Sequence, residues 1–233
     1  MNFSILKTLN SQVSRKYITG ITGIGLIVFL VEHLIGNLTV FGSVGAFNEY
    51  VEFLHSFGSL LYVAELGLFI LFLYHSILGI SIWLNRRKAR PQRYDIYSSK
   101  GGQSHQSLAS KSMIYTGVIT LIFIVLHLAH FKFGTVYTTT LNGEEVRDLK
   151  RLVIESFTQP AIALSYVFVL ALLIFHLSHG FWSACTSLGM QHNKTSKKIQ
   201  IGSYGFAIIL MLGFMFIPLY IMFTGGEGSL ISY

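Results

Sequence analysis

The sequence predicts an all-α integral membrane protein that crosses the bilayer five times. Of its 233 residues, 52% are hydrophobic and only 12% are charged, whereas about a quarter of the residues in a typical soluble domain are charged. The apolar residues form five runs, each long enough to cross a hydrocarbon core of about 30 Å as a helix. Within a single membrane domain, 1–233, the expected spans are about 17–39, 60–84, 113–131, 161–184 and 204–223.

The first span, 17–39, begins where a secretory signal peptide would be found. Its apolar run is longer than the core of such a peptide, has no small-residue cleavage site, and contains Glu32 and His33. We therefore interpret it as a membrane helix. None of the five spans contains Lys or Arg, as expected for helices that lie in hydrocarbon.

The basic residues lie in the segments outside the spans and predict the orientation of the chain. Three Lys or Arg residues lie in 1–16, seven in 85–112 and three in 185–203, whereas the connections on the other side of the membrane hold four. The positive-inside rule then predicts a cytoplasmic amino terminus and an outer carboxy terminus. The formal net charge of +7 is thus explained by topology and anionic lipid rather than by nucleic acid.

Two connections on the predicted outer side have apolar residues at helical spacing. In the first, these residues are Val44, Phe47, Tyr50, Val51 and Leu54. In the second, they are Val146, Leu149, Leu152, Val153 and Phe157. Both patterns predict short amphipathic helices on the membrane surface, and the alternative is an irregular capping loop.

Four spans each carry a histidine in apolar surroundings. They are His33, His75, His127 and His176. An ionisable side chain at membrane depth is costly and is a functional candidate by default, although a single one often only bonds to a neighbouring helix. Four of them, on four helices, are typical of b-type haem binding, because two imidazoles from facing helices hold the iron. The single cysteine, Cys185, excludes c-type attachment, a disulfide framework and iron–sulfur ligation by this chain alone.

The position of each histidine along its span predicts which two share an iron. The spans of His33 and His127 leave the cytoplasm, and these histidines follow the preceding basic residue by seventeen and sixteen positions, about 25 Å along a helix. One haem, held by this pair, is expected near the outer face. The spans of His75 and His176 return inward, and these histidines lie sixteen residues after Ser59 and Pro160. A second haem, held by this pair, is expected nearer the cytoplasm.

An internal repeat independently supports this choice of histidines. A Thr-Gly pair precedes His33 in the first span, at 22–23, and His127 in the third, at 116–117, with each glycine ten residues before its histidine. The first four spans are therefore expected to form a haem-binding bundle made of two copies of a two-helix unit. The repeat favours His127 over His130 as a ligand.

The second and fourth spans also match each other. An aromatic residue precedes His75 and His176, and a glycine, Gly79 or Gly180, follows four residues later. That glycine lies one turn away on the same helix face, where the missing side chain leaves room for a macrocycle, although glycine also serves helix packing. The match favours His176 over His179.

These residues resemble a known family, the five-helix, single-chain, dihaem cytochrome b subunit of succinate dehydrogenases and fumarate reductases. The resemblance extends from Arg15 to about Gly189. Its most specific stretches are Glu32-His33-Leu34, Ala46-Phe47-Asn48, Tyr74-His75, 116–123 and 174–183. The resemblance implies a succinate:quinone oxidoreductase in the bacterial cytoplasmic (inner) membrane. A flavoprotein subunit there oxidises succinate, and an iron–sulfur subunit exchanges electrons with this non-catalytic chain.

The resemblance also implies roles for individual residues. His33 and His127 correspond to the ligands of the distal haem, and His75 and His176 to those of the proximal haem beside the iron–sulfur subunit. His179 stands where the family can have Asn, which implies that it is not a ligand. The two haems would carry electrons to or from a quinone, and the dihaem type usually uses menaquinone.

Quinone chemistry also needs a group that handles protons. Glu65, a carboxylate in the outer part of the second span, is our first candidate, and Glu32, beside His33, is the second. The alternative for either is a neutral, hydrogen-bonded structural carboxyl. Two other functions stay open: a cytochrome b of another quinone-linked dehydrogenase, such as a hydrogenase or formate dehydrogenase, and a haem-free transporter or anchor.

Overall fold

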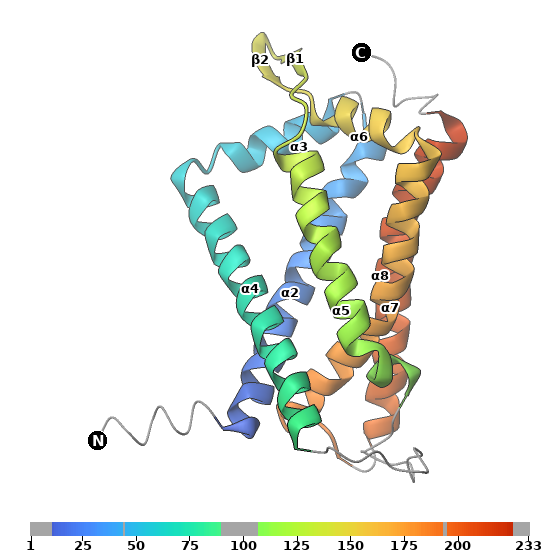
Figure 1. The fold of residues 1–233 in the computed structure, drawn as a ribbon. Coiled ribbons are helices and arrows are strands. Elements are labelled where there is room, and N and C mark those ends of the chain that lie inside the picture. The colour runs from blue at the N-terminus through green and yellow to red at the C-terminus, as the bar shows by residue number, and fades with distance from the viewer. Residues whose placement is uncertain (1–10, 44, 90–106, 193–194, 226–233) are drawn as a thin grey trace. The chain divides into compact units, whose positions relative to one another are not determined.

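The computed structural model describes residues 11–43, 45–89, 107–192 and 195–225. Its five membrane-spanning helices, drawn in Figure 1, are α2 Gln12–Leu38, α4 Ser59–Lys88, α5 Leu108–His127, α7 Pro160–Ser187 and α8 Ser196–Thr224. The described part is all-α apart from one short hairpin, which confirms the predicted fold class. Each helix begins one to eight residues before its predicted span, because helical hydrogen bonding continues where polar residues meet lipid headgroups.

Outside the described residues lie five of the basic residues used for the orientation: Lys7, Arg90, Arg93, Lys100 and Lys194.

Large apolar side chains on these helices are widely exposed, as a lipid environment requires. Examples are Val28, Val125 and Phe223, whose exposed fractions are 63%, 62% and 79%. A soluble protein rarely exposes apolar surface on this scale. The exposed residues therefore mark the faces of the helices that meet lipid.

Both short helices predicted in the connections are present. The first is α3, Ala46–His55, and the second is α6, Leu149–Phe157, so the alternative of irregular loops is wrong. The prediction for Val146 is wrong in detail, because this residue lies in a strand ahead of α6. Val44 lies outside the described residues.

A β-hairpin precedes α6 and was not predicted. Strand β1, Thr138–Leu141, pairs antiparallel with β2, Glu144–Arg147. The two residues between them, Asn142 and Gly143, have φ angles of 54° and 87°. Two-residue hairpin turns with positive φ at both positions favour Asn-Gly, so the hairpin follows from a local signal.

The described chain forms two compact units, and each of the five long helices contributes residues to both. Unit 1 comprises 1–28, 68–118 and 174–208, and unit 2 comprises 29–67, 119–173 and 209–233. The hairpin, α3 and α6 belong to unit 2. The expectation of a single membrane domain stays a prediction.

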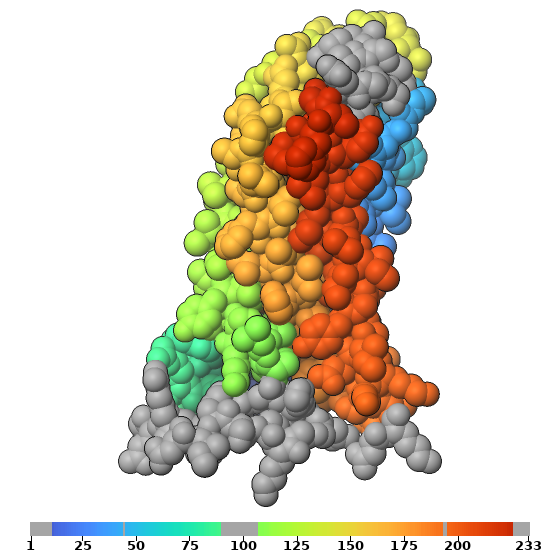
Figure 2. Space-filling view, turned by 90° about the vertical axis from the view of Figure 1, so that its right-hand side faces the viewer, coloured from blue at the N-terminus to red at the C-terminus, as the bar shows by residue number. Residues whose placement is uncertain are grey.

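Unit 2 has a hydrophobic core formed by its short elements and two long helices. Its buried residues are Val40, Phe47, Val153, Phe157, Ala163, Ile217 and Ile221. They come from the 3-10 turn η1, Thr39–Phe41, and from α3, α6, α7 and α8. Figure 2 shows the unit 2 segments of α7 and α8 side by side on one face. This core fixes the ends of the helices that carry His33 and His127.

A buried polar pair joins α3 to α6 within unit 2. The Asn48 amide donates to Asp148 Oδ1 at 2.8 Å, and Asn48 Oδ1 accepts from the backbone N–H of Lys150 at 3.1 Å. Asp148 also caps α6 by accepting from the N–H of Arg151 at 3.1 Å. Because these buried groups satisfy one another, the two short helices are held in one arrangement.

Unit 1 is held by close helix contacts at small residues. A Cβ added at Gly20 of α2 would lie 3.4 Å from the Cα of Ala184 in α7. Small residues let membrane helices approach closely and gain van der Waals contact. A polar contact from α2 to α4 adds to this packing, because the Arg15 guanidinium donates to Ser81 Oγ at 2.6 Å.

Candidate functional site

His33 and His127 lie next to each other within unit 2. His33 lies in α2 and His127 is the last residue of α5, and their ring centroids are 5.9 Å apart with the planes at 89°. Phe29 stacks on the His33 ring at 5.2 Å, and Phe214 of α8 approaches it at 5.7 Å. Aromatic side chains therefore surround the pair and exclude water from it.

The separation of these two rings fits a metal ion bound between them. A first-row metal binds an imidazole nitrogen at about 2 Å, which keeps the centroids of two opposing rings roughly 6 Å apart. The rings of His33 and His127 lie at 5.9 Å. Among the described residues, no three His, Cys, Asp or Glu side chains gather into a metal site. The pair therefore offers two imidazole ligands to a metal.

Polar neighbours orient the two rings. The Tyr166 hydroxyl of α7 lies 3.3 Å from His127 Nδ1. If that oxygen accepts a hydrogen bond from Nδ1–H, the Nε2 atom keeps its lone pair for a metal. Asn37, one turn after His33, donates to the His33 carbonyl at 2.7 Å and lies 3.4 Å from both ring nitrogens. No pattern in the sequence points to Tyr166 or Asn37.

In unit 1, His75 of α4 and His176 of α7 have matching surroundings. The Thr22 hydroxyl of α2 lies 3.2 Å from His75 Nδ1, and the Thr116 hydroxyl of α5 lies 3.2 Å from His176 Nδ1. The two histidines are also near enough for their rings to interact electrostatically. The structure thus brings the predicted proximal ligands into one unit, each beside a threonine of the preceding helix.

The hydrogen bonds of these threonines suit one assignment of the ring nitrogens. The Thr22 hydroxyl lies 2.9 Å from the Ile18 carbonyl, and the Thr116 hydroxyl lies 3.1 Å from the Ser112 carbonyl. If each hydroxyl donates its one hydrogen to that carbonyl, its oxygen accepts from the histidine Nδ1–H. This arrangement leaves Nε2 unprotonated on both rings, as metal binding requires.

The glycine after each threonine provides space for the same ring. A Cβ at Gly23 would lie 3.3 Å from His75 Cε1, and one at Gly117 would lie 3.2 Å from His176 Cε1. Both distances are tighter than ordinary van der Waals contact. Each Thr-Gly pair of the repeat therefore contacts the histidine of the next long helix and leaves room for its ring. The sequence did not predict this role for the pair.

Gly79 and Gly180 lie one turn beyond His75 and His176 in the same helices. A Cβ added at either glycine would meet no atom within 4 Å. Open space therefore lies beside each glycine within unit 1, as expected if a flat macrocycle passes there. In the same unit, the buried Trp182 indole N–H has no hydrogen-bond partner among the described residues.

The two additional histidines have other contacts. His130 Nε2 lies 3.0 Å from Ser156 Oγ of α6, and its ring stacks on Phe131 at 4.6 Å. His179 packs against Trp182 at 5.6 Å. Neither makes the ring or threonine contacts that characterise the two pairs, which agrees with the preference for His127 and His176.

The end of α5 departs from a regular helix directly after His127. Residues Leu128–Lys132 form the π-helical turn η3, and the Arg147 guanidinium donates to the Phe131 carbonyl at 2.8 Å. π-helical turns inside membrane or soluble helices are frequent at functional sites. The extra residue per turn changes the direction of His130 relative to His127, which the sequence did not predict.

The two candidate proton groups differ in their surroundings. Glu65 forms an ion pair with Lys132, and both side chains are about two-fifths exposed, at 40% and 41%. The hypothesis for Glu65 rests on a carboxylate at membrane depth, and the structure adds Lys132 as its ion-pair partner. The role of Glu65 with protons stays a prediction. Glu32 is exposed and lies near Tyr50 of α3. Burial raises the pKa of the Tyr50 phenol, and the Glu32 carboxylate raises it further.

Comparison with known proteins gives one informative similarity. No family model matches the chain, and no solved structure matches it significantly. The chain is similar to the succinate dehydrogenase cytochrome b558 subunit of Bacillus subtilis, with 25% identity over 179 residues, which cover 74% of this chain and 77% of that protein. A five-helix membrane chain with paired intramembrane histidines thus has a distant relative that is named as a cytochrome b.

Proposed function

We propose that this chain is the membrane-anchor cytochrome b subunit of a succinate:quinone oxidoreductase. It carries electrons between an iron–sulfur subunit and membrane quinone by means of two b-type haems. The observation that carries the proposal is the grouping of four histidines from four helices into two pairs, one in each compact unit. The similarity to a succinate dehydrogenase cytochrome b558 subunit supports the choice of complex.

Each proposed haem has two protein ligands. His33 and His127 hold the distal haem, and His75 and His176 hold the proximal haem. When bound, haem b supplies an iron centre that takes up and releases one electron at a time. The protein residues orient the imidazoles, through Tyr166 in unit 2 and through a threonine for each histidine in unit 1, and they keep water from the iron.

The chain itself performs no succinate chemistry under this proposal. It anchors a flavoprotein subunit and an iron–sulfur subunit to the bacterial cytoplasmic membrane, with the amino terminus in the cytoplasm and the carboxy terminus outside. The excess of Lys and Arg in the connections on the amino-terminal side supports this orientation.

The partner in the membrane is a quinone, which we propose to be menaquinone. Its reduction and oxidation require proton transfer, and Glu65 is the proposed group, with Glu32 second. Glu65 lies beside Lys132 and forms an ion pair with it. A Glu65→Gln complex that keeps both haems is expected to lose most quinone turnover, and unchanged turnover would refute this role.

The proposal is tested on the intact complex. Purification through a tag on this chain is expected to recover a flavoprotein with the chain, succinate–quinone activity, and two haems b per chain in the reduced-minus-oxidised spectrum. A b-type spectrum without a succinate-oxidising flavoprotein would indicate a hydrogenase or formate dehydrogenase cytochrome instead. A purified chain without a b-type spectrum would refute the haem-binding function.

A further inference from the structure

A groove lies between α5 and α7 within unit 2 and is separate from both proposed haem ligands. Its volume is about 320 Å³ and one side is open, which is within the range of small-molecule sites. Neither His33 nor His127 lines it, and neither do Glu65 and Glu32.

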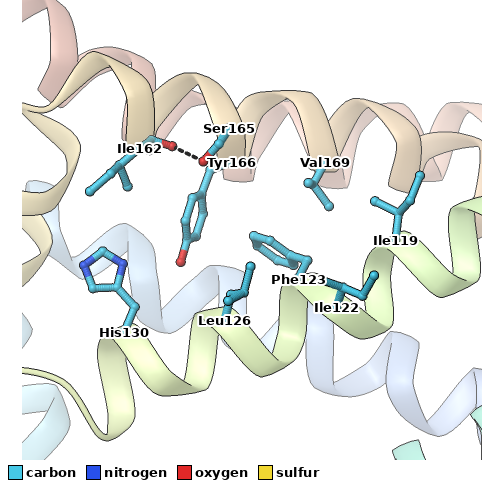
Figure 3. A pocket seen from close by; sticks show the side chains of 9 residues that line it. All are labelled: Ile119, Ile122, Phe123, Leu126, His130, Ile162, Ser165, Tyr166 and Val169. Atoms are coloured by element: carbon cyan, nitrogen blue, oxygen red, sulfur yellow. Dashed lines mark hydrogen bonds between the residues drawn. The ribbon is translucent and has the colours of Figure 1, made fainter.

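The groove is polar at one end and apolar along the rest. Figure 3 shows the His130 ring and the Tyr166 hydroxyl directed into the same end, with Ile119 and Val169 at the other. Ile122, on the α5 side, lies near Val169 and Ile119 at the apolar end. A ligand that fits this gradient has a compact polar head and a long apolar tail.

The hydrogen bonds of Tyr166 leave its O–H free to bind a ligand oxygen. The phenol oxygen lies 3.3 Å from His127 Nδ1, and if it accepts from that ring, its own hydrogen has no acceptor among the described residues. An O–H with this arrangement can donate to a carbonyl oxygen in the groove. Tyr166 thereby connects the groove directly to a proposed iron ligand.

The hydrogen bonds of His130 leave one of its ring nitrogens as an acceptor for a ligand hydroxyl. Ser156 Oγ lies 2.6 Å from the Leu152 carbonyl and 3.0 Å from His130 Nε2. If the hydroxyl donates to the carbonyl, its oxygen accepts from His130 Nε2–H. The other ring nitrogen, Nδ1, is then an acceptor. A carbonyl oxygen needs a donor and a hydroxyl needs an acceptor, and this end of the groove offers one of each.

We propose that this groove binds the head group of a membrane quinone, with an oxygen of the head group between Tyr166 and His130. Its isoprenoid tail follows the apolar side chains Ile119, Ile122 and Val169. Tyr166 donates to the oxygen of the quinone form, and His130 accepts from the hydroxyl of the quinol form. A phospholipid chain would use the apolar walls but neither polar group. The inference rests on the proposed quinone-linked function and adds the place and the recognising residues.

Val169→Trp tests the groove at a lining position that is neither a proposed haem ligand nor one of the two polar groups, His130 and Tyr166. The large indole fills the groove, whereas Leu164→Trp places the same side chain on an exposed position of α7 that does not line it. Both variants are prepared as intact complexes and must contain the wild-type haem content. Binding of menaquinone-2, which carries the naphthoquinone head group and a short isoprenoid tail, is then measured by calorimetry, together with the KM for this quinone and the kcat.

We expect Val169→Trp to raise the Kd and the KM at least tenfold, and Leu164→Trp to leave them within twofold. His130→Ala is expected to weaken binding threefold to tenfold, the loss of one hydrogen bond. Equal quinone affinity in the two Trp variants would overturn the assignment. So would a phospholipid that copurifies with the wild type and is lost only from Val169→Trp while quinone binding is unchanged. Failure of the proposed function is distinguishable, because a wild-type complex would then lack haem or succinate oxidation.

Discussion

The contact between the Thr116 hydroxyl and His176 gives a specific prediction about how this protein holds a haem. Thr116 is 3% exposed, and its hydroxyl oxygen lies 3.2 Å from His176 Nδ1. Thr116→Val keeps the shape of the side chain and removes the acceptor. The Met113 carbonyl also accepts a hydrogen bond from His176, so the ring keeps one of its two acceptors.

The expected loss of haem affinity depends on the remaining hydrogen bond from His176 to the Met113 carbonyl. Loss of a group that orients a metal-bound histidine typically lowers metal affinity by about 10-fold to 100-fold. Because one acceptor remains, we expect the lower limit, a haem affinity about tenfold weaker, which corresponds to about 1.4 kcal/mol. Thr22→Val is expected to have a similar effect through His75, since the Thr19 carbonyl remains as an acceptor there.

The assay isolates one haem. In a chain that carries His33→Ala and His127→Ala, only the haem of unit 1 is expected to remain. Its rate of transfer to excess apomyoglobin, in detergent, reports its dissociation. Thr116→Val is expected to speed this transfer about tenfold. Ser112→Ala, which removes a hydroxyl that bonds only to the Ala109 carbonyl in the described residues, is the control. Equal rates in the two variants would refute the orienting role of Thr116.

Three further changes test other parts of the structure. Gly117→Val places methyl groups against the His176 ring, since even its Cβ would lie 3.2 Å from Cε1, and should reduce haem content from two to one in the pyridine haemochrome assay. Asn48→Ala breaks the buried link between α3 and α6 and should lower the free energy of unfolding by about 2 kcal/mol, measured by denaturation in detergent. Burial lowers the pKa of Lys150, partly offset by Asp148. The folded chain thus binds this proton less tightly than the unfolded one, and stability should rise with pH up to about 10.5, a slope that Lys150→Met should remove.

The five spans and the four histidines were predictable because the membrane restricts the possibilities. In hydrocarbon, a long apolar run satisfies its backbone only as a helix, so span number and approximate position follow from composition. The histidine positions then predicted the pairs, and the structure places His33 with His127 and His75 with His176 in separate units. Their role as haem ligands stays a prediction.

Other features depend on contacts that no local pattern encodes. The ion-pair partner of Glu65 is Lys132, which is 67 residues away, so the sequence did not predict this pair. The π-helical turn after His127 depends on packing around Arg147. Thr22 and Thr116 were recognised as marks of a repeat, but their contact with the histidine of the next helix required the structure. The hairpin, in contrast, was predictable from Asn142-Gly143.

The haem content of paired histidine variants tests the central claim most directly. Each variant is purified and its haem b is measured per chain. We expect two haems in the wild type, one after either His33→Ala or His127→Ala, and still one when both are replaced together. Replacement of His33 together with His176, one from each pair, should leave none. Two haems in any single variant, or none in the His33→Ala and His127→Ala double variant, would contradict the account.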